Sequence, residues 1–142
     1  MKRVHIAACV IARHGFPVDL FEMKPKKYSP AHKRETLGEL VCSNSLGAQE
    51  RDSAPGLLKY EMAKLGSVVL DAAERSRVPA GRALGVDRGR FSDAVTTTVA
   101  SLSEIRVVRE ECPAVPDDGL VILASGPLTS DALGADMAKQ IG

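Results

Sequence analysis

The sequence of 142 residues has few aromatic side chains and almost no net charge. Tryptophan is absent and aromatic residues make up 4% of the chain, so base-stacking platforms and aromatic-lined carbohydrate clefts are not expected. The 19 lysine and arginine residues nearly balance the 18 aspartate and glutamate residues, which gives a formal net charge of +1. This balance excludes a nucleic-acid binder that relies on overall positive charge, but it leaves room for a local basic patch.

Cysteine and long apolar runs are also scarce. The three cysteines, Cys9, Cys42 and Cys112, form no CxxC pair, so neither a disulfide framework nor a metal site of the zinc-ribbon type is expected. No apolar run approaches the roughly 20 residues that span a bilayer, and the basic and then apolar start lacks a small-residue cleavage site. These absences predict a reduced, cytoplasmic protein without a membrane anchor.

What is present is the composition of an ordinary globular domain, with 44% hydrophobic and 26% charged residues. Apolar alternation and apolar runs between Pro and Gly predict strands at 3–8, 18–23, 83–86, 105–109 and 120–124. Apolar residues at helical spacing predict helices at 8–14, at 56–77, from a cap at Asp87 to Leu102, and from a cap at Thr129 or Ser130 to Gln140. Strands that alternate with helices predict an α/β fold with a mostly parallel sheet and flanking helices.

The strand expected at 18–23 ends beside Glu22, which provides half of a dinucleotide-binding pattern. In strand–helix–strand folds of this kind, a carboxylate at the tip of the second strand accepts hydrogen bonds from the ribose hydroxyls of an adenosine. The other half is missing, because no G-x-G-x-x-G follows the first strand and residues 7–17 are too few for a full crossover helix with its turns. Glu22 is therefore either a ribose ligand or a solvated carboxylate at a strand end.

A second candidate site follows the apolar run 120–124, at Ser125-Gly126-Pro127. A glycine after a buried parallel strand lets a ligand approach the backbone, and the start of the next helix offers N–H groups to a phosphate. The alternative is an ordinary turn between a strand and a helix.

The segment 24–56 is expected to be mostly loop and carries two further candidates. Cys42 lies beside Ser43, Asn44 and Ser45, where its thiol is a nucleophile, a group that touches a flavin ring, or an inert loop cysteine. A basic patch nearby would hold the phosphates of RNA or of a polyanionic cofactor, unless it is only a solvated loop. The basic patch consists of Lys24, Lys26, Lys27, Lys33 and Arg34.

Several stretches together resemble one family, the folate- and FAD-dependent tRNA (uracil-5-)-methyltransferases, and more distantly the glucose-inhibited division protein A group of tRNA-modifying flavoproteins. The matching stretches are 15–25 (GFPVDLFEMKP), 29–32 (SPAH), 39–46 (ELVCSNSL), 56–59 (GLLK), 78–81 (VPAG), 86–88 (VDR) and 124–130 (ASGPLTS). Their order and spacing hold over residues 15–142, which is nearly the whole chain. The CSNSL and GPLTS strings are the most specific of them.

The resemblance implies an FAD-binding, Rossmann-like domain and an enzyme that forms 5-methyluridine in the T-loop of tRNA. FAD would be the cofactor, with methylenetetrahydrofolate and NAD(P)H as co-substrates and tRNA as the partner. By the same resemblance, Glu22 and Lys24 belong to the cofactor site, and Gly126 packs against the FAD pyrophosphate. Ser43, Asn44 and Ser45 would line the isoalloxazine ring, and Cys42 is the candidate catalytic residue that handles the one-carbon unit.

Two departures from the family pattern limit this interpretation. The glycine-rich fingerprint is absent, and the chain ends at Gly142 where the family continues, so residues 1–142 are expected to be a partial, truncated FAD-binding domain. We therefore expect this chain by itself to hold no FAD and to methylate no tRNA. Two alternatives stay open, a non-catalytic α/β remnant and another flavin-dependent protein that modifies tRNA uridines.

Overall fold

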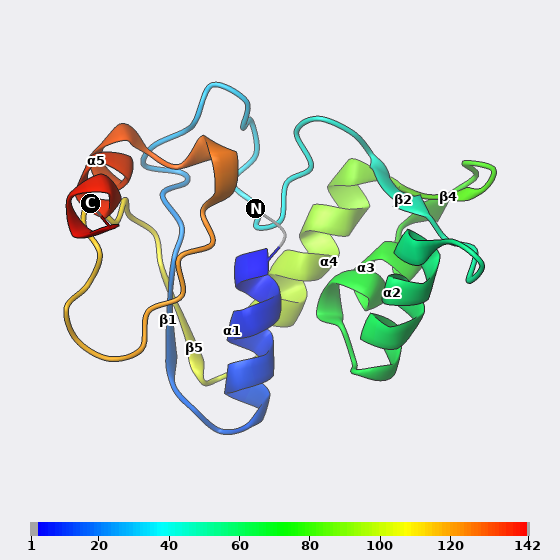
Figure 1. Ribbon diagram of the computed structural model, residues 1–142, viewed down its shortest axis with the longest axis horizontal. Coiled ribbons are helices and arrows are strands. Elements are labelled where there is room, and N and C mark those ends of the chain that lie inside the picture. Colours follow the sequence, from blue (N-terminus) through cyan, green and yellow to red (C-terminus); the bar gives the residue numbers. More distant parts are fainter. Residues whose placement is uncertain (1–2, 142) are drawn as a thin grey trace. The chain divides into compact units, whose positions relative to one another are not determined.

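The computed structural model describes residues 3–141 and divides into two compact units. Unit 1 consists of Met1–Glu35 and Ser103–Gly142, and unit 2 is the continuous stretch Thr36–Leu102. Both units combine helices with strands (Figure 1). The α/β fold class predicted from the sequence is therefore confirmed.

Unit 1 is built on a parallel pair of strands. Strand β1 (Val18–Phe21) pairs with β5 (Ile105–Val108), so that Val18 lies opposite Ile105 and Phe21 opposite Val108. Helix α1 (Arg3–Arg13) packs against both strands (Figure 1). The short 3-10 helix η1 (Gly126–Leu128) and helix α5 (Asp131–Ile141) follow near the end of the chain.

Helix α1 replaces the strand predicted at 3–8, and that prediction was wrong. Ala8, Cys9 and Ala12 are buried, whereas Val10 is 43% exposed. Residues one turn apart on a helix share a face, and this face is apolar. A helix directly before β1 occupies the position of the crossover helix in a strand–helix–strand unit.

Unit 2 contains a small antiparallel sheet and three helices. The strand order is β2–β4–β3, with β2 at Ser45–Ala48, β3 at Arg77–Val78 and β4 at Ala83–Val86. The helices are α2 (Ala54–Lys64), α3 (Val68–Arg75) and α4 (Arg88–Ala100). The strands predicted at 83–86 and 105–109 both form, but β4 pairs antiparallel with its neighbours.

The single helix predicted at 56–77 is two helices, α2 and α3. Gly66 adopts a positive φ of 74°, which ends α2 because residues with a Cβ rarely take this conformation. The Ser67 hydroxyl then accepts a hydrogen bond from the N–H of Leu70 at 3.4 Å and caps α3. The predicted cap of α4 is confirmed, since the Asp87 carboxylate accepts from the N–H of Arg90 at 2.8 Å.

Most of the buried apolar side chains belong to unit 2, where α3 and α4 pack together. Phe91, Val95 and Val99 on α4 are each at most 1% exposed. Helix α3 is buried on most of its surface, through Val68, Val69, Leu70, Ala72 and Ala73. This core fixes α4 and the strand β4 that leads into it.

Candidate functional site

The first predicted site residue, Glu22, directly follows β1 and is buried. Its backbone N–H donates to the carbonyl of Val108 at 3.0 Å, which continues the pairing of β1 with β5. Glu22 is 6% exposed and Lys24 is 0% exposed. The interpretation of Glu22 as a solvated carboxylate is therefore wrong.

The Glu22 carboxylate has polar partners on Lys24. The backbone N–H of Lys24 donates to Oε1 of Glu22 at 3.1 Å, and Nζ of Lys24 lies 3.9 Å from Oε2. A buried charge is costly unless an opposite charge and hydrogen bonds compensate it. Arg109, just beyond β5, holds the backbone at Lys24 and further along the following loop, because it donates to the carbonyls of Lys24 at 3.3 Å and Glu35 at 2.9 Å.

Three lysines of the predicted basic patch are either buried or paired with acidic side chains. Lys24 is buried and takes no part in a surface patch. Lys26 lies 3.7 Å from the carboxylate of Glu110, and Lys27 lies 2.7 Å from that of Glu111. Hydrogen bonds from Lys27 and from the Ser130 hydroxyl lower the pKa of Glu111. Within the patch, neighbouring acids thus offset much of the positive charge that would attract a phosphate.

The Cys42 loop lies in unit 2 and is ordered by its own polar groups. Asn44 is joined to β4 twice, through its side-chain amide to the carbonyl of Val86 at 3.2 Å and through its carbonyl to the N–H of Val86 at 2.9 Å. The Ser43 hydroxyl accepts from the N–H of Ser45 at 3.0 Å. Cys42 is exposed, so its thiol is accessible in a loop that hydrogen bonds hold in place.

Gly126 begins the 3-10 helix η1 with a φ of 70° and is exposed. Its carbonyl accepts from the N–H of Thr129 at 3.2 Å and from the Thr129 hydroxyl at 2.6 Å. The strand predicted just before it, at 120–124, does not form. The predicted cap of the following helix is confirmed at Ser130, whose hydroxyl accepts from the N–H of Leu133 at 3.4 Å.

The predicted site residues fall into two groups. Glu22, Lys24 and Gly126 belong to unit 1, whereas Cys42 and residues 43–45 belong to unit 2. Within unit 1, the Glu111 carboxylate binds both Lys27 and Ser130, and it connects the loop after β1 to the start of α5.

Sequence reasoning missed two contacts that shape unit 1. One is the pair of carbonyls, of Lys24 and Glu35, that Arg109 holds. The other joins the hydroxyl of Ser29 to Nδ1 of His32 at 2.7 Å, with His32 5% exposed. Both contacts depend on how individual side chains are oriented, and no residue pattern in the sequence indicates that orientation.

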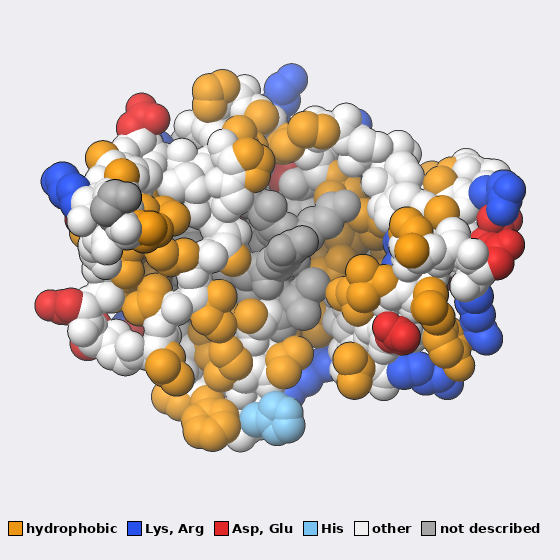
Figure 2. Space-filling view, in the orientation of Figure 1, with side chains coloured by type: hydrophobic (Ala, Val, Ile, Leu, Met, Phe, Trp, Pro, Cys, Tyr) orange, Lys and Arg blue, Asp and Glu red, His pale blue; other side chains and the backbone are white. Residues whose placement is uncertain are grey.

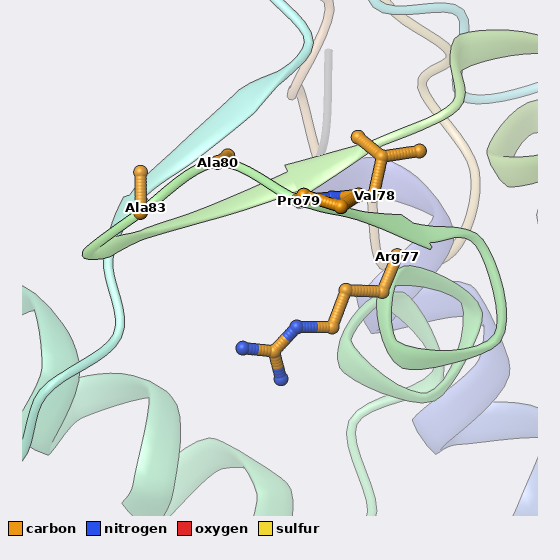
Figure 3. A pocket seen from close by; sticks show the side chains of 6 residues that line it. Arg77, Val78, Pro79, Ala80 and Ala83 are labelled. Atoms are coloured by element: carbon orange, nitrogen blue, oxygen red, sulfur yellow. The ribbon is translucent and has the colours of Figure 1, made fainter.

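An open pocket of about 440 Å³ lies along the β3–β4 hairpin (Figure 3). Its lining includes Val78, Pro79 and the side chain of Arg77, whose guanidinium donates to Glu74 at 3.2 Å and also to Gln49. None of the predicted site residues lines it. Among residues 3–141 there is also no group of three or more His, Cys, Asp or Glu side chains that could hold a metal ion, and no helix there is long and apolar enough to cross a membrane.

Comparison with known proteins places these residues in a family. Residues 5–136 match the family described as glucose inhibited division protein A. The chain belongs to this family. The FAD-binding, Rossmann-like fold of this family agrees with the position of α1 directly before β1, which pairs parallel with β5.

Relatives in this family carry the name methylenetetrahydrofolate–tRNA-(uracil-5-)-methyltransferase TrmFO. The protein of Aquifex aeolicus is 52% identical over 136 residues, which cover 96% of this chain and 31% of that protein. The proteins of Thermosynechococcus vestitus and Trichormus variabilis are each 53% identical and cover 92% and 96% of this chain. The chain spans 29–31% of the length of these relatives. The predicted resemblance to the tRNA methyltransferases is confirmed.

The residues of this chain fit FAD only in part. A buried carboxylate follows β1, and an exposed glycine with positive φ stands before α5, as an adenosine ribose and a pyrophosphate would require. The glycine turn of a strand–helix–strand unit lies before its crossover helix, and Ala8 and Cys9 lie inside α1 with buried side chains, so they belong to the helix and not to the turn. Burial also raises the pKa of the Cys9 thiol, which suits a packing role. The described residues 3–141 thus hold the helix that follows a phosphate-binding turn, and the turn itself is not among them.

Proposed function

We propose that this chain is the FAD-domain segment of a folate-dependent tRNA (uracil-5-)-methyltransferase. The observation that carries the proposal is the buried carboxylate of Glu22 at the end of β1, in a chain about 50% identical to proteins of that name. A carboxylate at this position accepts hydrogen bonds from an adenosine ribose. Lys24 contributes by holding Glu22, and Gly126 contributes a backbone that a pyrophosphate can approach.

The second group of residues serves the reactive end of the cofactor. Ser43, Asn44 and Ser45 line the isoalloxazine ring, and the exposed thiol of Cys42 handles the one-carbon unit. Methylenetetrahydrofolate and NAD(P)H are the co-substrates, and the uracil of a tRNA is the methyl acceptor. A tRNA substrate places this activity in the cytoplasm.

A specific observation favours a second proposal for the isolated chain. Helix α1 stands in the position of the crossover helix, and no glycine turn precedes it among residues 3–141. Pyrophosphate binding in this kind of fold depends on that turn and on the helix N-terminus behind it. We propose that the 142 residues alone retain no flavin and form no 5-methyluridine, so stoichiometric flavin absorbance in the purified chain would contradict this part.

A graft separates the two proposals. Residues 15–136 of this chain would replace the matching segment of the Aquifex aeolicus relative, which then supplies the glycine turn. The graft is expected to hold FAD and to form 5-methyluridine in tRNA, because the Glu22 and Cys42 groups then complete the site. A folded graft that binds no flavin would contradict the assignment of these residues to an FAD domain.

Two substitutions in the graft test the named residues. Cys42→Ala is expected to abolish methylation, whereas Cys112→Ala should leave it unchanged. Glu22→Ala is expected to weaken FAD binding by about 1.5–3 kcal/mol, the usual value for a hydrogen bond to a charged group. Glu22→Gln is its matched control, because it keeps an acceptor for the N–H of Lys24. Near-normal methylation in Cys42→Ala would remove Cys42 from the reaction.

A further inference from the structure

Glu111, just beyond β5, connects two segments of unit 1 that are far apart in the sequence. Its Oε1 accepts a hydrogen bond at 2.7 Å from Nζ of Lys27, which lies in the loop after β1. The same carboxylate is hydrogen-bonded to the hydroxyl of Ser130, directly before α5. One side chain therefore holds the loop after β1 and the start of α5 together.

The neighbouring ion pair between Lys26 and Glu110 differs in geometry. Surface charges of both signs surround α5 (Figure 2), and exposed ion pairs contribute little to stability. Lys26 and Glu110 form such a pair, with side chains 68% and 54% exposed and charged atoms 3.7 Å apart. The side chain of Glu111 is 25% exposed and has the shorter contact. Glu110 is thus a natural control for Glu111.

On the side of β1, Lys27 is tied to the backbone beside Glu22. The N–H of Lys27 donates to the carbonyl of Met23 at 2.9 Å, and Met23 lies between Glu22 and Lys24. The N–H of Lys24 in turn donates to the Glu22 carboxylate at 3.1 Å. The position of Lys27 is therefore coupled to that of the Glu22 carboxylate.

On the side of α5, Ser130 is tied to Gly126. Thr129 directly precedes Ser130, and its N–H and hydroxyl both donate to the carbonyl of Gly126, at 3.2 and 2.6 Å. The Ser130 hydroxyl also accepts from the N–H of Leu133 at 3.4 Å. Because a hydroxyl has one donor and two acceptor sites, Ser130 can cap α5 and donate to Glu111 at the same time.

These contacts connect Glu22 to Gly126 without a break. Under the proposed function, on which this inference rests, Glu22 receives the adenosine ribose of FAD and Gly126 its pyrophosphate. A ligand that touches both residues binds more tightly when they are already held at the right separation, since ordering them on binding costs free energy.

We propose that Glu111 is a positioning residue of the dinucleotide site, which sets the separation between Glu22 and Gly126 by holding Lys27 and Ser130 together. It acts through these two partners and does not touch FAD. The length of its side chain matters as well as its charge. An aspartate keeps the charge but is one methylene shorter, and hydrogen bonds tolerate only about half an ångström in length.

The connection itself is tested in the 142-residue chain by amide hydrogen exchange. Glu111→Asp is expected to speed exchange about threefold or more at the N–H groups of Lys27 and Leu133, because both sides of the connection are loosened. Glu110→Asp is the matched control and should leave both rates unchanged. Unchanged exchange at either N–H group in Glu111→Asp would overturn the proposal, as would the same acceleration in Glu110→Asp.

The effect on the site is tested in the graft described above, with FAD and adenosine as probes. Glu111→Asp is expected to raise the Kd of FAD about tenfold, because FAD must then order both contacts itself. The Kd of adenosine, which reaches Glu22 but not Gly126, should change less than about twofold. A loop that simply loses its structure would weaken both ligands, so an equal change for both would overturn a positioning role. Glu110→Asp should change neither.

A charge exchange checks that the pair with Lys27 carries the effect. Glu111→Lys and Lys27→Glu should each weaken FAD binding about tenfold, and the double variant should recover to within about threefold of the wild type. A double variant no better than the single ones would overturn the proposal. If the unsubstituted graft binds no FAD, the proposed function fails and this inference fails with it. If that graft binds FAD and Glu111→Asp binds it equally well, this inference alone is wrong.

Discussion

Unit 2 is one continuous stretch of chain around the packed helices α3 and α4, whereas unit 1 joins two distant stretches through the β1–β5 pair. Unit 2 holds most of the buried apolar side chains, and unit 1 holds the buried Glu22–Lys24 pair and the exposed segment 120–124. The buried core that stabilises the fold and the buried charged pair of the candidate cofactor site therefore lie in different units. Unit 2 is a self-contained core that presents an exposed thiol, and unit 1 is a polar site on a small sheet.

The largest effect is expected from a substitution in the core of unit 2. Phe91→Ala removes a ring that is 1% exposed on α4, and the cavity should lower the free energy of unfolding by about 3–5 kcal/mol. Amide exchange followed by mass spectrometry should show lost protection in 36–102. Leu65→Ala is the control and should change little, because Leu65 is 83% exposed. Equal loss of protection in residues 18–21 would contradict the description of unit 2 as a separate core.

Two glycine substitutions compare the packing around α2 in unit 2 with the packing around α5 in unit 1. A Cβ on Gly56 would lie 1.8 Å from the carbonyl oxygen of Glu50, so Gly56→Ala should destabilise unit 2 by about 1–3 kcal/mol. Gly134 lies inside α5 with open space around it, so Gly134→Ala should stabilise that helix by up to about 1 kcal/mol. Chemical denaturation measures both. The free energy of unfolding should fall in Gly56→Ala and rise in Gly134→Ala. An unchanged free energy in Gly56→Ala would contradict the close approach of α2 to residue 50.

The smallest effect concerns the surface ion pair between β1 and β5. Arg106 donates to both carboxylate oxygens of Asp19 and lowers the pKa of this carboxyl. A carboxyl whose pKa is lower in the folded state stabilises it above the unfolded pKa, and this contribution is lost as the pH falls through the folded pKa.

Asp19→Asn should therefore lose less stability than the wild type when the pH falls below the unfolded pKa of about 3.9. Urea unfolding midpoints at neutral pH and at low pH measure the difference. The pair is exposed, so the effect should be small. Asp118→Asn, an exposed carboxylate outside both strands, should follow the wild-type pH dependence, and the same behaviour in Asp19→Asn would contradict a role for the pair.

Local signals predicted much of the fold. The alternation at 18–23 and the strands at 83–86 and 105–109 identified β1, β4 and β5, and Asp87 marked the start of α4. These elements formed because a neighbouring helix or strand packs on the apolar face that the pattern marks. The segment 120–124 has an equally strong pattern, but a strand also needs a partner edge, and the sequence does not say whether one exists.

Other features depended on signals that were weak or non-local. The apolar pattern at residues 3–8 suggested a strand, but the segment forms part of helix α1, which packs against β1 and β5. For the candidate site, the sequence places Cys42 in a polar loop, and the structure shows the thiol exposed there. The burial of Glu22 was not predicted, because it results from Lys24 and from Arg109, which lies 85 residues beyond Lys24.

The insertion of unit 2 between β1 and β5 has a consequence for the order of events during synthesis. The partners Asp19 and Arg106 are 87 residues apart, so β1 leaves the ribosome long before β5 exists. Closing a loop of this length costs entropy that grows with its length. The contacts of unit 2 span shorter separations, such as the bond from the N–H of Leu37 to the Thr96 hydroxyl at 2.9 Å. This bond brings the start of unit 2 to the last helix of the unit, and it shortens the effective distance that β1 and β5 must bridge.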